Sequence, residues 1–320
     1  MKIVFFGTPD FASHTLARMA EHNLDVVGVV TPPDRPRGRG HKLQPCSVKE
    51  TAMHLLPEVP ILQPESLKDV DFIHQLKSLE ADLFIVIAFR MLPKEVWAMP
   101  RLGTFNLHAS LLPDYRGAAP IQHAIMQGEE ETGVTTFFLN EEIDEGHILL
   151  QRKVPITSEE TGGSLHDKLM EVGADLVLET IDLLDREGSD VQQSPQQVEA
   201  RNLHYATKIF KEDRLLAFHS ATAKELELKV RAMSPYPATI GVMQAEGEQP
   251  IEMKIYRARI LPDIVGLRSG EAEVTKESIK VQCREGALEI LELQYPNKRR
   301  METTAFLLGN PLQDKSIYFQ

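Results

Sequence analysis

An asparagine and a histidine stand two residues apart in the segment Gly-Thr-Phe-Asn-Leu-His, whose alternation predicts a strand. Asn106 and His108 would therefore project from the same face of that strand. An amide N–H can donate a hydrogen bond to a developing oxyanion, and an imidazole can move a proton near neutral pH. The pair could serve an acyl-type transfer, although an isolated Asn-x-His is more often a turn cap beside a satisfied core histidine.

Strand and helix patterns alternate along the first part of the chain and would position this pair. Near-continuous apolar runs indicate a parallel sheet covered on both faces, and such sheets bind ligands beyond the carboxyl ends of their strands. Gly7, Ala88 and His108 stand at such ends. The turn after the first strand lacks Gly-x-Gly-x-x-Gly, which argues against a nicotinamide dinucleotide. Strands are predicted at 2–6, 25–30, 60–63, 83–88 and within 132–156, and helices at 9–22, 47–55, 70–79, 118–127 and 164–184.

The character of the chain changes after residue 205. Residues 186–203 are rich in Gln, Ser, Glu and Asp, which is typical of an exposed connection. The short alternating strands that follow leave open a small barrel or a sandwich. We expect a first domain over 1–189, a linker over 190–205 and a second domain over 206–320. One helix is predicted at 223–233, with strands at 240–245, 251–260, 278–282 and 287–294.

The composition is that of an ordinary folded protein. The chain has 320 residues, of which 42% are hydrophobic and 26% charged, enough for two domains with their own cores. No apolar run approaches the roughly 20 residues of a membrane span, so we expect a cytoplasmic protein without membrane contact. Cys46 and Cys283 lie outside any Cys-x-x-Cys pattern, and Asp144 with His147 would supply only two ligands, so no metal site is expected.

Charge is unevenly distributed. The net charge of −12 argues against indiscriminate nucleic-acid binding, yet residues 207–320 carry 17 Lys and Arg against 16 Asp and Glu. The acidity therefore belongs to the first part of the chain. Within it, residues 34–49 form a basic segment that we expect to be a loop making a directed anionic contact; a solvated Arg/Gly turn is the alternative. Its basic residues are Arg35, Arg37, Arg39, Lys42 and Lys49.

Several segments together resemble the folate-dependent formyltransferases. Ser-Leu-Leu-Pro at 110–113 and Tyr-Arg-Gly-Ala-Ala-Pro at 115–120 resemble the family's central signature, and Glu-Ile-Asp-Glu-Gly at 142–146 is similar to its Ile-Asp-x-Gly loop. The resemblance implies an α/β fold: a Rossmann-like parallel-sheet formyltransferase domain followed by a small OB-like β-barrel. Further matching segments lie at 6–12, from 33 onward and, as Tyr-Ala-x-Lys, at 205–208.

The resemblance also implies the reaction and the residues that perform it. A formyl group would pass from 10-formyltetrahydrofolate to the amino group of methionyl initiator tRNA. Asn106 would donate to the oxyanion, His108 would stabilise it or relay a proton, and Asp144 would orient the imidazole. At 88–93 this chain reads Ala-Phe-Arg-Met-Leu-Pro where many relatives read Ala-Tyr-Gly, so the wall of the donor pocket would differ. The folate would be bordered by Ser110, Leu111, Leu112, Pro113, Ala88, Phe89 and Arg90.

The acceptor is the least determined part of this interpretation. A glycinamide ribonucleotide, an amino sugar nucleotide or water could serve the same three residues, and a folate- or RNA-binding protein without catalysis is a further alternative. The arginine segment and the near-neutral second domain favour tRNA, since arginines neutralise phosphates and stack on exposed bases. Residues 298–300 are more typical of a plain surface charge run. We expect a monomer that contacts tRNA through Arg35, Arg37, Arg39, Lys42 and Lys208.

Overall fold

The computed structural model describes residues 1–37, 42–197, 203–313 and 315–320. The chain divides into two compact units. Unit 1 comprises Met1–Gly117, Glu131–Pro155 and His166–Tyr205, and unit 2 comprises Ala118–Glu130, Ile156–Leu165 and Ala206–Gln320. Each unit thus draws on separate stretches of the chain, whereas the contiguous domains expected from the sequence, with limits at 189 and 205, stay a prediction.

Unit 1 is built on a seven-stranded sheet of described residues with the order β10-β9-β7-β6-β1-β2-β5. β1 pairs in parallel with β2 and β6, and β7 continues the parallel part beside β6. All residues of β1 and β6 are buried, which confirms the covered parallel sheet expected from their apolar runs. β9 and β10 complete the sheet in antiparallel pairing. The strands are β1 Ile3–Gly7, β2 Val26–Val30, β5 Ile61–Leu62, β6 Leu83–Ile87, β7 Thr104–His108, β9 Glu131–Phe138 and β10 Ile148–Pro155.

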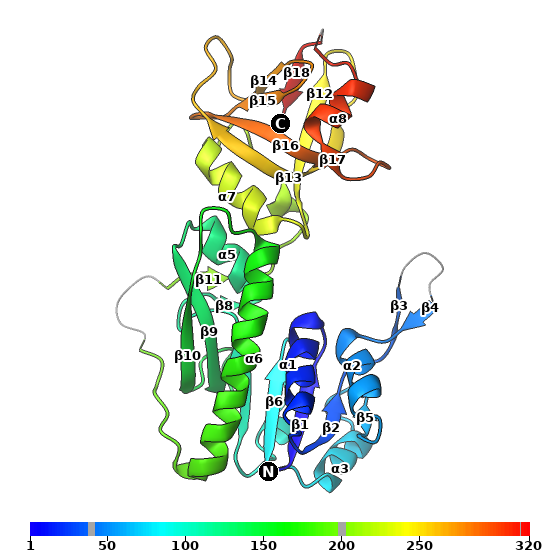
Figure 1. The fold of residues 1–320 in the computed structure, drawn as a ribbon, viewed down its shortest axis with the longest axis vertical. Helices are drawn as coiled ribbons and strands as arrows, with labels where there is room; N and C mark the ends of the chain where they lie inside the picture. The colour runs from blue at the N-terminus through cyan, green and yellow to red at the C-terminus, as the bar shows by residue number, and fades with distance from the viewer. Residues whose placement is uncertain (38–41, 198–202, 314) are drawn as a thin grey trace. The chain divides into compact units, whose positions relative to one another are not determined.

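Helices lie along this sheet (Figure 1). α1 and α6 are side by side, and an ion pair joins them, with Arg18 Nη2 lying 2.9 Å from Asp175 Oδ1. α3 begins where Asp69 accepts a hydrogen bond of 2.9 Å from the backbone N–H of Phe72, an N-cap that satisfies one of the unpaired donors of the first turn. The helices are α1 Asp10–Glu21, α2 Ser47–Leu55, α3 Val70–Ser78, α4 Lys94–Trp97 and α6 Gly162–Glu187, followed by the 3-10 turn η1 Gly188–Asp190.

The basic segment after β2 is a hairpin in its described part, which corrects the expectation of a loop. β3 (Arg35–Arg37) pairs antiparallel with β4 (Lys42–Gln44), in a register that places Arg35 opposite Gln44. Arg39 lies outside the described residues. The two strands project from the unit beyond α2 (Figure 1).

A clasp of three polar side chains holds the base of the hairpin. Lys49 Nζ on α2 donates to Asp34 Oδ2 at 2.8 Å and to Gln63 Oε1 at 2.7 Å. Gln63 Nε2 in turn donates to Asp34 Oδ1 at 3.0 Å and to the carbonyl of Pro32 at 2.8 Å. Hydrogen bonds from Gln63 and Lys49 hold the pKa of Asp34 below its ordinary value. The charge of Lys49 is therefore paired with that of Asp34 within the protein.

Unit 2 contains a closed six-stranded barrel within its described residues. The order β13-β12-β18-β14-β15-β16 is closed by the pairing of β13 with β16, and all these pairs are antiparallel. This decides the alternative of barrel or sandwich in favour of the barrel. Its interior contains large apolar side chains such as Phe218, Ile255, Leu293 and Phe319. The strands are β12 Thr239–Ala245, β13 Ile251–Leu261, β14 Glu271–Val274, β15 Ile279–Gln282, β16 Ala287–Gln294, β17 Met301–Glu302 and β18 Ile317–Phe319.

Short elements complete the fold. α7 (Ala223–Met233) begins with a capping box, in which Thr222 and Glu225 each accept from the other's backbone N–H. None of the described helices is both long enough and apolar enough to cross a membrane. The remaining elements are α5 Pro120–Met126, α8 Thr303–Gly309, η2 Glu212–Arg214, β8 Arg116–Gly117 and β11 Tyr205–Ala206.

The two cysteines are free and buried. Burial raises the pKa of the Cys283 thiol to about 12, from an ordinary value of 9.0. The reactive thiolate at pH 8 should therefore be about 1,000-fold scarcer than for an exposed cysteine. We expect native protein to resist labelling at Cys283 by an aromatic disulfide reagent, whereas protein unfolded in guanidinium reacts at both cysteines. Rapid labelling of Cys283 in the native state, located by peptide mass, would contradict this.

Candidate active site

Asn106 and His108 lie on β7, at the carboxyl end of the parallel part of the sheet. Asn106 is paired in register with Val86 on β6 and with Phe137 on β9, so the strand is fixed on both sides. Asn106 Oδ1 is buried and has no hydrogen-bond partner among the described residues. Buried polar atoms are almost always satisfied in folded proteins, since an unsatisfied one costs about 1–3 kcal/mol. The fold does not use this amide oxygen, which marks Asn106 as a group available to a ligand.

His108 is buried, and its imidazole is held by a backbone carbonyl. Nε2 lies 2.8 Å from the carbonyl oxygen of Tyr115, which can only accept, so Nε2 carries a proton. The other ring nitrogen, Nδ1, lies 3.9 Å from Asp144 Oδ2. This separation is longer than a hydrogen bond. The orientation of the ring therefore comes from Tyr115, while Asp144 places a negative charge beside Nδ1.

Asp144 is held in place by its own loop. Its backbone is in the left-handed region at φ 56°, and its Oδ2 accepts a hydrogen bond of 3.0 Å from the N–H of Gly117. Gly146 closes the loop against β9, where a Cβ atom would lie 1.5 Å from the carbonyl oxygen of Phe138. Only glycine permits this approach. The glycine of this Asp-x-Gly segment therefore has a steric cause.

Residues 110–113 form a turn whose backbone is bonded to β9 and β10. Thr135 Oγ1 donates to the carbonyl of Ser110 at 2.6 Å and accepts from the N–H of Leu112 at 3.2 Å. Gln151 Nε2 donates to the carbonyl of Leu112 at 2.9 Å. Neither Thr135 nor Gln151 could be predicted as part of the site, because both are ordinary strand residues. They fix the turn that contains the expected folate contacts Ser110, Leu111, Leu112 and Pro113, all of which except Leu111 are buried.

The other expected folate contacts follow β6. Ala88 has a left-handed backbone at φ 47°, and the Phe89 ring meets the buried Phe6 edge-on at a centroid distance of 5.8 Å. Arg90 donates from Nη1 to the carbonyl of Glu65 at 2.7 Å, and from Nη2 to that of Pro64. Burial lowers the pKa of Arg90, Glu65 raises it, and the charge of Arg35 lowers it further. Arg35 and Arg90 are thus electrostatic neighbours.

The expected tRNA contacts divide between the units. Arg35 is exposed on β3, Arg37 ends that strand and Lys42 begins β4. Lys208 belongs to unit 2, where its Nζ lies 5.4 Å from the centroid of the exposed Phe210 ring. An exposed cation beside an exposed aromatic ring is suited to nucleic acid, since one can neutralise a phosphate and the other can stack on a base.

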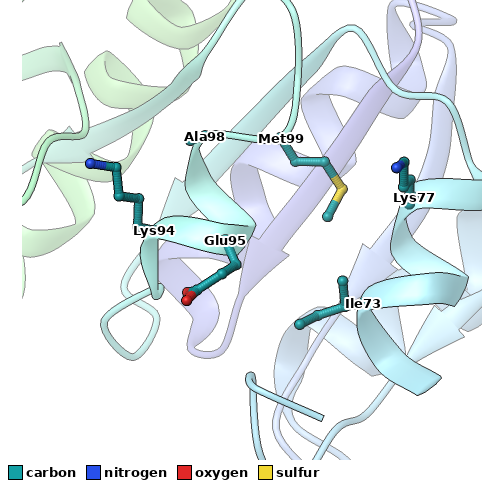
Figure 2. Close-up of a pocket in the computed structure, with 6 residues that line it drawn as sticks. All are labelled: Ile73, Lys77, Lys94, Glu95, Ala98 and Met99. Carbon is teal, nitrogen blue, oxygen red and sulfur yellow. The ribbon is translucent and has the colours of Figure 1, made fainter. Parts of the chain in front are cut away.

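A pocket elsewhere in unit 1 contains none of these residues. Its volume is about 520 Å³, and Figure 2 shows Lys94 and Glu95 on one side and Lys77 and Ile73 on the other. Ala98 and Met99 complete the lining. Within the ranges that the structure describes, no group of three or more His, Cys, Asp or Glu is arranged to hold a metal ion.

Both parts of the chain match models of known protein families. Residues 1–181 match the model described as "Formyl transferase", and residues 208–311 match "Formyl transferase, C-terminal domain". Among curated proteins, the chain is 45% identical over 316 residues to "Methionyl-tRNA formyltransferase" of Bacteroides thetaiotaomicron, covering 98% of this chain and 97% of that protein. It is 46% identical over 312 residues to the protein of the same name from Parabacteroides distasonis, with coverage of 97% and 95%.

Solved structures share the fold at low identity. HypX from Aquifex aeolicus in complex with tetrahydrofolic acid is 21% identical, with a TM-score of 0.61 over 98% of this chain and 48% of that one. An N-formyltransferase from Helicobacter canadensis in complex with folinic acid and dTDP-3-aminofucose is 18% identical, with a TM-score of 0.65 over 92% of this chain and 99% of that one. At such identities the likeness shows the fold alone.

Proposed function

This chain belongs to the formyl transferase family, and on that premise we propose that it transfers a formyl group from 10-formyltetrahydrofolate to the amino group of methionyl initiator tRNA. The 45% identity over nearly the whole chain to proteins named for this activity supports the acceptor. A folate as formyl donor is supported by the family and by the tetrahydrofolate in a structural neighbour. A role in translation initiation places the protein in the cytoplasm, and we expect it to act as a monomer.

The chemistry is an acyl transfer between two nitrogen atoms. The methionyl amine attacks the formyl carbon, and the new C–N bond gives a tetrahedral oxyanion. Collapse of this intermediate breaks the bond between the formyl carbon and N10 of the folate. The amine loses a proton and N10 gains one, so the site has to stabilise an oxyanion and move a proton.

The geometry around β7 supports one role for each residue. The side-chain N–H of Asn106 would donate to the oxyanion. Its oxygen, which has no partner among the described residues, would be left to accept from an N–H of a substrate. His108 would exchange the proton through Nδ1, because Nε2 is occupied by the carbonyl of Tyr115. Asp144, 3.9 Å from Nδ1, would stabilise the positive charge that the ring carries after taking up a proton. The convergence of His108 and Asp144 at the end of β7 is the observation that carries this assignment.

A direct experiment compares acceptors with the donor fixed. Purified protein would receive 10-formyltetrahydrofolate with charged initiator tRNA, uncharged initiator tRNA or an amino sugar nucleotide, and the formylated products would be separated by mass. We expect product only with charged tRNA. Transfer to the sugar nucleotide in place of tRNA would contradict the proposed acceptor.

Arg35 gives a test of the tRNA contact. We expect Arg35→Ala to raise the KM for tRNA about tenfold at moderate salt and to leave the KM for the folate unchanged, because an exposed guanidinium on the hairpin would neutralise a phosphate. The slope of log(kcat/KM) against log[salt] should become less negative by roughly one unit or less, as expected for one lost phosphate contact. Lys68→Ala, which removes an exposed charge from a turn before α3, is the control. An unchanged slope for Arg35→Ala would refute the contact.

A further inference from the structure

Gln196 uses both ends of its amide on the loop that contains Asp144. Its Nε2 donates to the carbonyl of Asp144 at 2.7 Å and to the carbonyl of Gly146 at 3.0 Å. Its Oε1 accepts from Arg116 Nη2 at 2.6 Å and from Arg116 Nε at 3.0 Å. A group that donates to two carbonyls and accepts from a cation must present an N–H and an oxygen together. Among side chains of this length, only glutamine does so.

Arg116 connects this amide to the signature segment. Its side chain is only 6% exposed, and its Nη1 donates to Glu145 Oε1 at 2.7 Å, so the charge is paired within the same loop. The next residue, Gly117, supplies the N–H that binds the carboxylate of Asp144. Arg116 and Gln196 together therefore hold residues 144–146 against the segment that follows His108.

Gln196 and His204, both within the expected linker over 190–205, each bind one of the two residues that lie beside the ring nitrogens of His108, Asp144 and Tyr115. Gln196 holds Asp144, as described above. At the other end, the carbonyl of His204 accepts from the N–H of Tyr115 at 2.6 Å, and the two rings stack at a centroid distance of 5.4 Å. Tyr115 is the residue whose carbonyl holds Nε2 of His108. A stretch that the sequence suggested to be a plain linker thus contacts the catalytic histidine's partners from two directions.

We propose that Gln196 is a positioning residue for catalysis: its amide holds the left-handed loop at Asp144 so that the carboxylate stays beside Nδ1 of His108. The inference rests on the proposed function, because it assigns Gln196 an effect through Asp144 and no contact with either substrate. A displacement of a catalytic group by about 1 Å can slow a reaction by up to a hundredfold. Loss of the Gln196 amide should therefore act on kcat and leave the binding of tRNA and folate intact.

Two substitutions of Gln196 distinguish a role in positioning Asp144 from a general role in stabilising the fold. Gln196→Met keeps the length of the side chain and removes every hydrogen bond. Gln196→Glu keeps an oxygen for Arg116 but turns a second oxygen toward the carbonyls of Asp144 and Gly146. We expect both variants to lower kcat tenfold or more, with the KM for tRNA and for the folate within twofold of wild type. Gln192→Met, at an exposed position of the same segment, should match wild type.

A double-mutant cycle tests the route of the effect. If Gln196 acts through Asp144, then Gln196→Met should slow Asp144→Ala by no more than twofold, since the group that it positions is already absent. A further tenfold loss of kcat in the Asp144→Ala background would overturn the proposal. A wild-type kcat in Gln196→Glu would also overturn it, because it would mean that residue 196 has only to accept hydrogen bonds from Arg116. Failure of the wild-type protein to formylate charged tRNA would instead refute the proposed function.

Discussion

Asn106→Ala is expected to lower kcat for formyl transfer by a hundredfold to a thousandfold, with both KM values close to those of wild type. The loss of one oxyanion donor typically raises the barrier by about 2.7–4 kcal/mol, and the interaction exists only once negative charge has formed. The backbone pairing of residue 106 with Val86 and Phe137 does not depend on the side chain. Steady-state kinetics with charged initiator tRNA, together with circular dichroism and thermal unfolding, would measure the effect.

Asn106→Asp is the matched comparison for this prediction. It has nearly the same shape as asparagine but would place a carboxylate where the oxyanion develops, so it should be at least as slow as Asn106→Ala. A folded Asn106→Ala protein with kcat within threefold of wild type would exclude the oxyanion role. The same conclusion would follow if Asn106→Asp were faster than Asn106→Ala at neutral pH.

The second large effect is expected at His108. His108→Ala should lower kcat by about a hundredfold to ten-thousandfold, the range over which a general acid–base residue contributes. His108→Gln offers an amide that can donate to the carbonyl of Tyr115, as Nε2 does, but it cannot exchange a proton. We therefore expect His108→Gln to fold like wild type and to remain nearly as slow as His108→Ala, as shown by single-turnover rates.

His147→Ala is the control for the loss of an imidazole near the same loop. His147 is exposed, and its Nδ1 lies 3.1 Å from Gln193 Oε1, away from the residues assigned to catalysis. It should keep near wild-type kcat. Comparable activity in His108→Gln and wild type would mean that the imidazole orients the loop and moves no proton.

Elements with strong local signals could be predicted closely from the sequence. The helix expected at 223–233 and the strand expected at 287–294 have the same limits in the structure. The first is defined by its capping box at Thr222 and Glu225, and the second by a run of alternating apolar residues. Both signals lie within the element itself, so they need no tertiary information.

Elements that depend on distant partners could not be predicted. β18 (Ile317–Phe319) is short and pairs with β12 and with β14 (Glu271–Val274), both far along the chain. β14 is also short; besides β18, it pairs with the nearby β15. The hairpin of β3 and β4 contains Arg, Pro, Lys and Gln, which are not typical of strands. Neither the closure of the barrel nor the clasp at Asp34 follows from local pattern.

The candidate site shows the same division. Asn106 and His108 could be placed on one face from the strand pattern, whereas Asp144 required the family resemblance. The role of Tyr115 in holding the imidazole was not predictable, because a backbone carbonyl has no signature in the sequence. Gln196 lies in a polar stretch without periodicity, and its proposed role rests on the carbonyl groups and the guanidinium that it meets in space.

The segment that carries Gln196 also covers part of an edge strand. β10 is the outermost strand of its sheet, and Ile148 and Ser194 exchange two backbone hydrogen bonds, of 2.8 Å and 2.9 Å. An open edge can recruit a strand from another molecule, which charged side chains such as Arg152 and Lys153 oppose further along β10. Detachment of this segment would therefore do more than disturb the loop at Asp144. It would expose the outer edge of β10 at Ile148, whose inner edge stays paired with β9, so inactivation and self-association of the protein would arise from the same event.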